Sequence, residues 1–159
     1  MRLIILADTH NNYPLAIRAL DAVGNADRII HLGDTLVDAG IIEIALGREL
    51  IKVPGNCDAD AALPREIVQV FDRQRFLITH GDRYLVKAGL GRLAQKAAKE
   101  RVQVVLYGHT HLPAITERDG ILYVNPGTLK EGTATPTVAL VTVGKGKVTA
   151  EIVEIPPSP

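Results

Sequence analysis

Several features that mark particular classes of protein are scarce in this sequence of 159 residues. There is one cysteine, Cys57, so no disulfide can form within the chain. No apolar run approaches the roughly 20 residues needed to span a bilayer. The apolar stretch at residues 3–7 is also too short for the core of a signal peptide. We therefore expect a cytoplasmic protein with no part embedded in a membrane.

Net charge of one sign and aromatic side chains are lacking as well. Eighteen basic and eighteen acidic residues give a formal net charge of zero, and 4% of the residues are aromatic. A neutral chain has no global field that gathers nucleic acid or an anionic membrane. No aromatic-rich segment is available to stack bases. A polynucleotide substrate is therefore not favoured.

The length and the order of the apolar runs indicate how the chain is organised. With 159 residues, 47% of them apolar, it can fill one core but is short for two ordinary domains. We expect one domain over residues 1–155 and a disordered tail over 156–159, which has nothing to pack against. Short aliphatic runs alternate with more polar helical stretches in the first two-thirds, as in βα units. Asp119-Gly120 and Gly144-Lys145-Gly146 then predict antiparallel hairpins.

The same patterns predict the individual elements. Pro14 at a first helical position and glycines after the apolar periods predict the ends of helices. The expected helices cover residues 14–23, 37–46 and 90–99. The expected strands cover residues 3–7, 29–32, 50–53, 64–71, 75–79, 102–107, 115–117, 121–124, 138–143 and 147–155.

Short polar clusters follow five of these apolar runs, and they contain four of the five histidines. About one strand and one crossover separate successive clusters, so we expect all of them at the same end of the sheet. The carboxyl ends of strands are where ligands bind in open α/β sheets. Together the clusters offer carboxylates, an amide oxygen and imidazoles, enough ligands for two cations. They are Asp8-Thr9-His10, Gly33-Asp34, Gly55-Asn56-Cys57-Asp58, His80-Gly81-Asp82 and Gly108-His109-Thr110-His111.

In this order the clusters resemble the motifs D-x-H, G-D, G-N-H-D/E, H and G-H-x-H of the calcineurin-like binuclear metallophosphoesterases. The resemblance covers roughly residues 1–130. It implies an α/β (α+β) fold, a single-domain four-layer αββα sandwich of two mixed β-sheets. It also implies a ligand set in which Asp34 bridges two metal ions. One ion would be held by Asp8, His10 and His111, and the other by Asn56, His80 and His109.

The chemistry of these ligands narrows the choice of ion. Mixed imidazole and carboxylate ligands favour manganese, with nickel, zinc or iron as alternatives, over magnesium or calcium. Two divalent ions, two carboxylates and a bridging hydroxide leave a charge of about +1, which attracts a phosphate ester. The resemblance therefore implies a metal-dependent phosphodiesterase in which a metal-bridging hydroxide attacks a small phosphate diester. The catalytic residues expected on this basis are Asp34, Asn56, Cys57, Asp58, His80 and His109.

Cys57 departs from the family pattern, because most relatives carry a histidine there that assists the leaving group. A thiol is shorter and forms weak hydrogen bonds, so loop packing is favoured and a catalytic role stays open. Asp58 and Asp82 are expected to orient imidazoles or loop amides, with turn formation as the alternative for Asp82. Asn125-Pro126-Gly127-Thr128 resembles a loop that borders the site in compact members of the family, although taken alone it is an ordinary turn. For His31, which precedes Asp34 in a strand, packing in the core or behind the ligands is favoured over ligation.

Two other functions stay open at this point. The fold also occurs as a protein-binding subunit of sorting complexes in which the metal site is degraded, so a non-catalytic scaffold is one alternative. The complete ligand set argues against it. A phosphomonoesterase that uses the same metals is the other. No insertion is long enough to form a substrate lid, so the sequence identifies neither the physiological substrate nor the oligomeric state.

Overall fold

The computed structural model describes residues 1–59 and 62–156, and its secondary structure follows the predicted order closely. The helices are α1 (Tyr13–Val23), α2 (Leu36–Leu46) and α3 (Gly91–Glu100), with a short 3-10 helix, η1 (Asp82–Tyr84). The strands are β1 (Arg2–Leu6), β2 (Arg28–His31), β3 (Ile51–Lys52), β4 (Glu66–Phe71), β5 (Gln74–Thr79), β6 (Val104–Leu106), β7 (Ala114–Arg118), β8 (Ile121–Asn125), β9 (Thr137–Gly144) and β10 (Lys147–Glu154).

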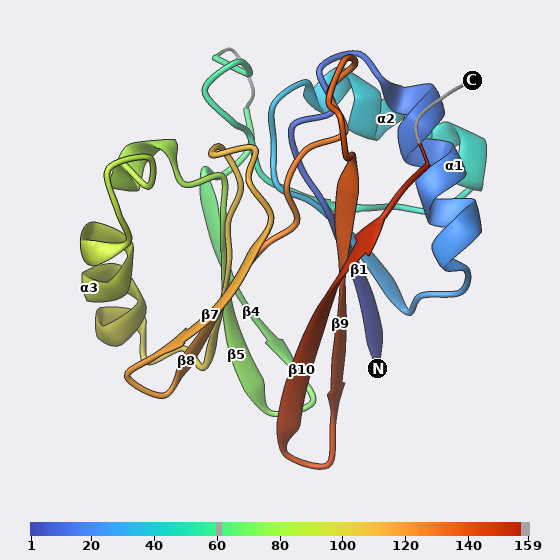
Figure 1. Cartoon of the computed structure of the whole chain (residues 1–159). Helices are drawn as coiled ribbons and strands as arrows, with labels where there is room; N and C mark the ends of the chain where they lie inside the picture. The colour runs from blue at the N-terminus through green and yellow to red at the C-terminus, as the bar shows by residue number, and fades with distance from the viewer. Residues whose placement is uncertain (60–61, 157–159) are drawn as a thin grey trace.

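The strands form two mixed sheets. The first has the order β10-β9-β1-β2-β3, in which β1, β2 and β3 are parallel and β9 is antiparallel to both of its neighbours. The second has the order β4-β5-β6-β8-β7, in which β5, β6 and β8 are parallel and β4 and β7 are antiparallel to their partners. Helices α1 and α2 cover the first sheet and α3 covers the second (Figure 1). The four-layer αββα sandwich is therefore confirmed.

Three apolar clusters hold the four layers together, and alternation along β1 shows how. Leu3 and Ile5 point between the sheets, where they join Phe76 and Ile78 of β5. The intervening side chains, such as Ile4, face α1 and α2. A third cluster lies between α3 and the outer face of the second sheet. Because successive strand side chains point to opposite faces, one apolar strand serves two layers.

Helix ends follow the predicted signals. Pro14 lies in the first turn of α1, and Gly24 follows its last residue with φ +82°. Gly47 ends α2 with φ +62°, a left-handed conformation that glycine adopts without steric cost.

Three features of the structure differ from the expectations. The strand expected at 50–53 shortens to Ile51–Lys52, because Pro54 follows closely and has no N–H for a ladder. Helix η1 was not expected. The five polar clusters also follow strands of two sheets rather than one, since β1, β2 and β3 belong to the first and β5 and β6 to the second.

The C-terminal end is described only in part. Ile155 is buried and its N–H donates to Pro136 O at 2.8 Å, so the packing of the domain includes this residue. Pro156 is exposed, and residues 157–159 of the expected tail lie outside the described residues. The domain boundary at residue 155 stays a prediction.

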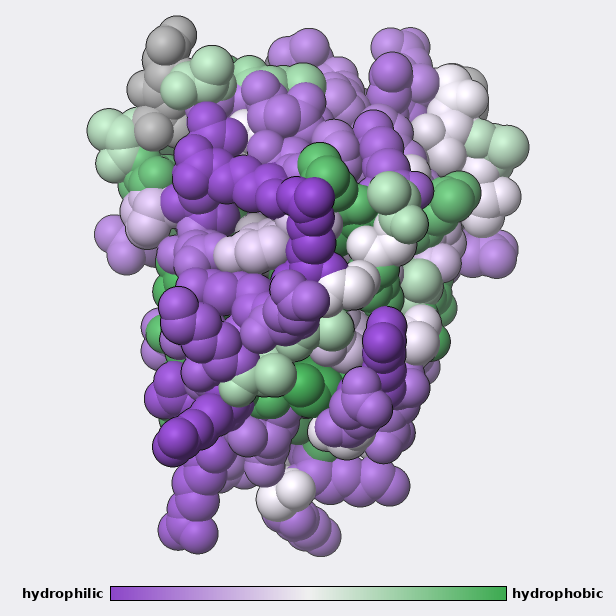
Figure 2. All heavy atoms as spheres, turned by 90° about the vertical axis from the view of Figure 1, so that its left-hand side faces the viewer, coloured by the Kyte–Doolittle hydropathy of each residue, from purple (hydrophilic) through white to green (hydrophobic). Residues whose placement is uncertain are grey.

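The surface around α3 is predominantly hydrophilic (Figure 2). On this side Lys96 forms an ion pair with Glu66 of β4 at 2.6 Å, which ties α3 to the edge of the second sheet, and a second pair within α3 with Glu100 at 2.8 Å. None of the helices within residues 1–59 and 62–156 has the length and apolar character required to cross a membrane.

Candidate metal centre

Five loops follow the carboxyl ends of parallel strands in the two sheets, and they converge at one end of the molecule. They are the loops after β1, β2, β3, β5 and β6, and together they bring all seven expected metal ligands close to one another. Several of these ligands have a backbone conformation that side-chain-bearing residues rarely adopt. Positive φ angles of +53° at Asp8, +45° at His10, +60° at Asp34, +67° at His109 and +61° at His111 place them in the left-handed region. Such strain costs about 1–3 kcal/mol per residue and concentrates at functional sites.

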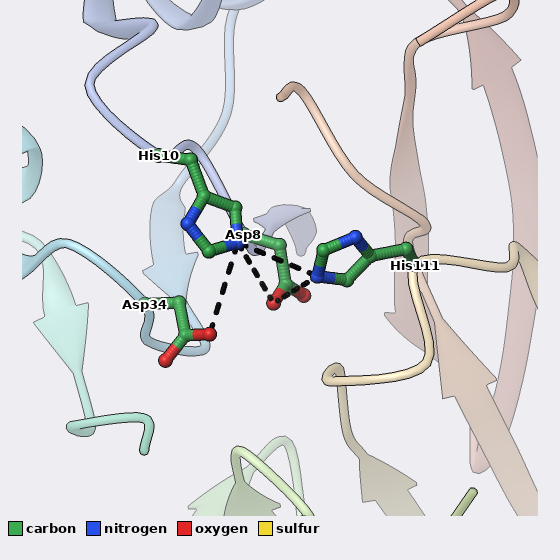
Figure 3. A group of neighbouring side chains, drawn as sticks. All are labelled: Asp8, His10, Asp34 and His111. Atoms are coloured by element: carbon green, nitrogen blue, oxygen red, sulfur yellow. Dashed lines mark hydrogen bonds and ion pairs between the residues drawn. The ribbon is translucent and has the colours of Figure 1, made fainter. Parts of the chain in front are cut away.

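One group of ligands consists of Asp8, His10, Asp34 and His111 (Figure 3). His111 Nε2 lies 3.1 Å from Asp8 Oδ1 and 3.4 Å from His10 Nε2. His10 Nε2 in turn lies 3.8 Å from Asp34 Oδ2 and 4.0 Å from Asp8 Oδ1. Ligands at 2.0–2.2 Å from a shared ion are about 3–4 Å from one another. The spacing therefore fits a metal ion.

The second group consists of Asp34, His80 and His109, with Asn56 beside it. His80 Nε2 lies 3.1 Å from His109 Nδ1, 3.2 Å from Asn56 Oδ1 and 3.6 Å from Asp34 Oδ1. On the other side of the ring, His80 Nδ1–H donates to Leu32 O at 2.8 Å. Since a neutral imidazole has one N–H, this bond leaves the Nε2 lone pair directed into the group.

The buried carboxylates support a cation in this position. Asp34 belongs to both groups, with Oδ2 toward His10 and Oδ1 toward His80. Asp8 is fully buried, and its Oδ1 is the buried side-chain atom without a hydrogen-bond partner among the described residues. An unsatisfied buried oxygen is costly, and a metal ion held with His111 would satisfy it. The residues therefore fit the metals that the resemblance implies.

The electrostatics of the two groups differ. Burial tends to raise the pKa of Asp34, but the hydrogen bond from Cys57 N–H and, when the His80 ring is protonated, the charge of His80 outweigh burial and lower it. Burial, repulsion from His80 when that ring is protonated, and repulsion from Lys87 lower the pKa of His109. An ionised carboxylate and a neutral imidazole are the forms that bind metal.

Cys57 contacts Asp34 twice. Its backbone N–H donates to Asp34 Oδ1 at 2.9 Å, and its thiol donates to Oδ2 at 3.3 Å. Burial, the hydrogen bond to Asp34 and the charge of Asp34 raise the pKa of the thiol to about 11. The thiol of Cys57 therefore stays protonated at neutral pH and donates its hydrogen bond to the carboxylate of Asp34.

The loops around the ligands are fixed by other polar side chains. Asp58 accepts hydrogen bonds from Asp34 N, Leu36 N and Gly55 N at 3.0, 2.8 and 2.9 Å, so it joins the loops after β2 and β3. Asp82 lies in η1, and its charge raises the pKa of His109 against the causes above. It lies beside the site and outside both ligand groups.

Sequence reasoning missed several neighbours of the ligands. The hydroxyl of Thr128 donates to Asp8 O at 2.8 Å, and Arg65 donates to Gly55 O at 2.8 Å. Lys87 lies close enough to His109 for their charges to interact. The resemblance of Asn125-Pro126-Gly127-Thr128 to a loop that borders the site in compact family members was the signal for Thr128. No local pattern marked Arg65 or Lys87, because only the folded loops bring them to the site.

A family model described as the calcineurin-like phosphoesterase superfamily domain matches residues 1–146. The chain belongs to this superfamily. Phosphodiesterase MJ0936 of Methanocaldococcus jannaschii is 30% identical over 144 residues, which cover 80% of this chain and 83% of the relative.

Solved structures with lower identity share the fold of this phosphoesterase. A Streptococcus pneumoniae protein, described as a conserved uncharacterized protein and predicted phosphoesterase, superposes with a TM-score of 0.81 at 23% identity, covering 96% of this chain and 88% of that protein. Wild-type Vps29 from Entamoeba histolytica, solved in complex with Zn²⁺, gives a TM-score of 0.75 at 20% identity, covering 97% and 99% of the two chains. Family membership and the two ligand groups thus identify a metallophosphoesterase-type hydrolase with candidate metal ligands.

Proposed function

We propose that the protein is a phosphodiesterase that uses two divalent metal ions, with manganese favoured, to hydrolyse a small phosphate diester. The observation that carries the proposal is the position of Asp34, whose two carboxylate oxygens face different ligand groups. A carboxylate in such a position can bridge two ions. The relative named as a phosphodiesterase supports the diester assignment.

The roles of the residues follow from their groups. Asp8, His10 and His111 would hold one ion, and Asn56, His80 and His109 the other, with Asp34 shared. When bound, the two ions would activate water as a nucleophile and offset the charge of the transition state. Leu32 O fixes the orientation of His80, and Asp58 fixes the loops that carry Asp34 and Asn56. The Cys57 thiol donates a hydrogen bond to Asp34, so its main role is to help to fix the loop that carries Asp34.

The alternatives are weighed by the same residues. A scaffold needs no ligands, whereas here all seven expected ligands converge, so a catalytic function is favoured. A phosphomonoesterase is the second candidate, because Lys87, whose charge lowers the pKa of His109, offers a cation for the additional charge of a monoester.

Metal dependence is the direct test. The protein would be stripped with chelator and then assayed on bis-nitrophenyl and mononitrophenyl phosphate with manganese, nickel, zinc or magnesium. We expect no hydrolysis in the stripped protein, recovery with manganese, and two metal ions per chain by elemental analysis. Full activity after exhaustive chelation, or fewer than one ion per chain at saturation, would contradict the proposal.

A further inference from the structure

His31 is the one histidine of the chain outside the ligand groups, and it is fully buried at the end of β2. Burial lowers the pKa of His31 to about 4. The negative charges of Asp8, Asp58 and Asp34 raise this pKa, but by less than burial lowers it. The ring is therefore neutral at pH 7, with one N–H donor and one nitrogen acceptor.

The hydrogen bonds of His31 determine which nitrogen is which. Gly33 N–H donates to His31 Nδ1 at 3.1 Å, so Nδ1 carries the lone pair. The proton is then on Nε2, which lies 3.2 Å from Thr9 Oγ1 and donates to it. The Thr9 hydroxyl donates onward to Asp34 O at 3.4 Å. The bonds run in one direction from the Gly33 amide to the Asp34 carbonyl.

This path spans a stretch of backbone that needs support. Gly33, Asp34 and Thr35 have successive φ angles of +97°, +60° and +73°. A β-branched residue such as Thr35 is a clear outlier at positive φ, and strained residues persist only where their surroundings fix them. His31 and Thr9 hold the amide of Gly33 and the carbonyl of Asp34 at the two ends of the strained peptides.

The path also connects two ligand-bearing loops. Thr9 lies between Asp8 and His10 after β1, while Gly33 and Asp34 follow β2. Asp8 N–H donates to Gly33 O at 2.9 Å, which adds a second link between the same loops. A shift of the hydrogen-bond path would therefore move Asp34 relative to the ligands of the β1 loop.

We propose that His31 and Thr9 form a clamp that sets the position of the Asp34 carboxylate between the two ligand groups, so that His31 is a positioning residue for metal binding. The inference rests on the proposed function only in that it takes Asp34 as a metal ligand. Since a clamp acts on metal affinity, it can be tested without a substrate.

Substitutions divide the clamp into its two bonds. His31→Leu fills much of the volume but removes both the acceptor for Gly33 N–H and the donor to Thr9. His31→Asn keeps an oxygen acceptor near the position of Nδ1. Thr9→Val removes the hydroxyl, and Thr9→Ser retains it. Phe76→Leu, in the fully buried core between the sheets, is a control for general loss of stability.

The experiment is calorimetric titration of the metal-free full-length proteins with Mn²⁺, with circular dichroism to confirm folding. We expect His31→Leu and Thr9→Val to weaken Mn²⁺ binding by roughly 10–100-fold, the usual effect of losing groups behind metal ligands. The double variant should be no weaker than His31→Leu, because both changes break one path. Thr9→Ser and Phe76→Leu should bind as the unchanged protein does, and His31→Asn should be intermediate.

The results separate the clamp from the proposed function. Wild-type binding of two Mn²⁺ ions without diester hydrolysis would contradict the function and leave the clamp testable by affinity. Wild-type Mn²⁺ affinity in folded His31→Leu and Thr9→Val would overturn the clamp. If His31→Leu does not fold, the comparison of Thr9→Val with Thr9→Ser decides, since equal affinities in that pair would overturn it too.

Discussion

Asp34 is the residue on which both ligand groups depend. Asn at position 34 keeps the size of the side chain but removes the charge that compensates two ions. We expect Asp34→Asn to lower Mn²⁺ affinity and diester hydrolysis by more than about a hundredfold, beyond the effect of groups that only support ligands. The measurement is calorimetry with steady-state kinetics, and Asp72→Asn in the exposed β4–β5 turn is the matched control. A nearly normal Asp34→Asn enzyme would rule out a bridging role.

Cys57 contacts the same carboxylate but is a weaker partner. Its thiol is exposed, and its backbone N–H to Asp34 does not depend on the side chain. With a nitrophenolate leaving group protonation contributes little, so Cys57→Ala should retain activity within about tenfold, or about 1.4 kcal/mol. Kinetics on bis-nitrophenyl phosphate would measure this. A loss above a thousandfold with metal content unchanged would instead make the thiol a catalytic group.

The residues of the site were predictable to different degrees. The seven expected ligands carry distinctive side chains in a fixed order, so their clustering could be expected from the sequence. Arg65 and Lys87 could not, because basic residues occur throughout the chain and only the folded loops bring these two to the site. Thr9 stood in the first polar cluster, but its bond to His31 depends on the pairing of β1 with β2 and could not be predicted. Whether each expected residue acts as proposed stays a prediction for the variants above.

At the scale of loops and helices, two glycines offer a matched comparison. A Cβ atom on Gly55 would lie 2.1 Å from Asp34 Oδ1 and 2.6 Å from Asp34 N, whereas one on Gly40 in α2 meets nothing within 4 Å. Gly55→Ala must therefore displace Asp34, and we expect Mn²⁺ affinity to fall more than about tenfold.

Gly40→Ala should instead stabilise α2 by about 0.5–1 kcal/mol and leave metal binding unchanged. This corresponds to a rise in Tm of roughly 1–4 °C, which calorimetric melting would detect. Normal Mn²⁺ affinity in Gly55→Ala would show that the loops after β2 and β3 can separate without consequence for the site.

The ends of helices and strands could be predicted where residues near in the sequence determine them. Gly24 and Gly47 follow α1 and α2 where the sequence predicted the helices to end. The turn at Asp72-Arg73 joins β4 to β5 between the strands expected at 64–71 and 75–79. Helix η1 had no such signal, because its support comes from distant groups. Tyr84 donates to Glu66 of β4, and Val86, which follows η1, is buried in the apolar cluster between α3 and the second sheet.

For the whole molecule, the resemblance gave the sandwich, but the spacing of the clusters alone suggested one sheet. Parallel strands of two facing sheets have the same apolar character as strands of one sheet, since both are buried on both sides. The hairpin of β4 and β5 starts the second sheet, and nothing local distinguishes it from an edge of the first. The candidate metal centre therefore lies where the two sheets meet rather than in a crevice of one sheet.

The charge of the whole molecule bears on the choice of substrate. The formal net charge is zero, so attraction of a phosphate ester must come from the site. Two bound divalent ions, two carboxylates and a bridging hydroxide would give the site a net charge of about +1. This matches the single charge of a diester, and we expect kcat/KM for bis-nitrophenyl phosphate to exceed that for mononitrophenyl phosphate at saturating manganese.

Lys87 is the group that could reverse this preference, because it lies near His109. It is exposed, so water and salt screen its charge, and exposed ion contacts contribute at most about 1 kcal/mol. Lys87→Met should therefore lower kcat/KM for the monoester by about fivefold or less and leave the diester unchanged. Parallel kinetics on both esters would measure this, with Lys99→Met on α3 as the control. A wild-type preference for the monoester would contradict the diester assignment, and its disappearance in Lys87→Met would identify this ammonium as the cause.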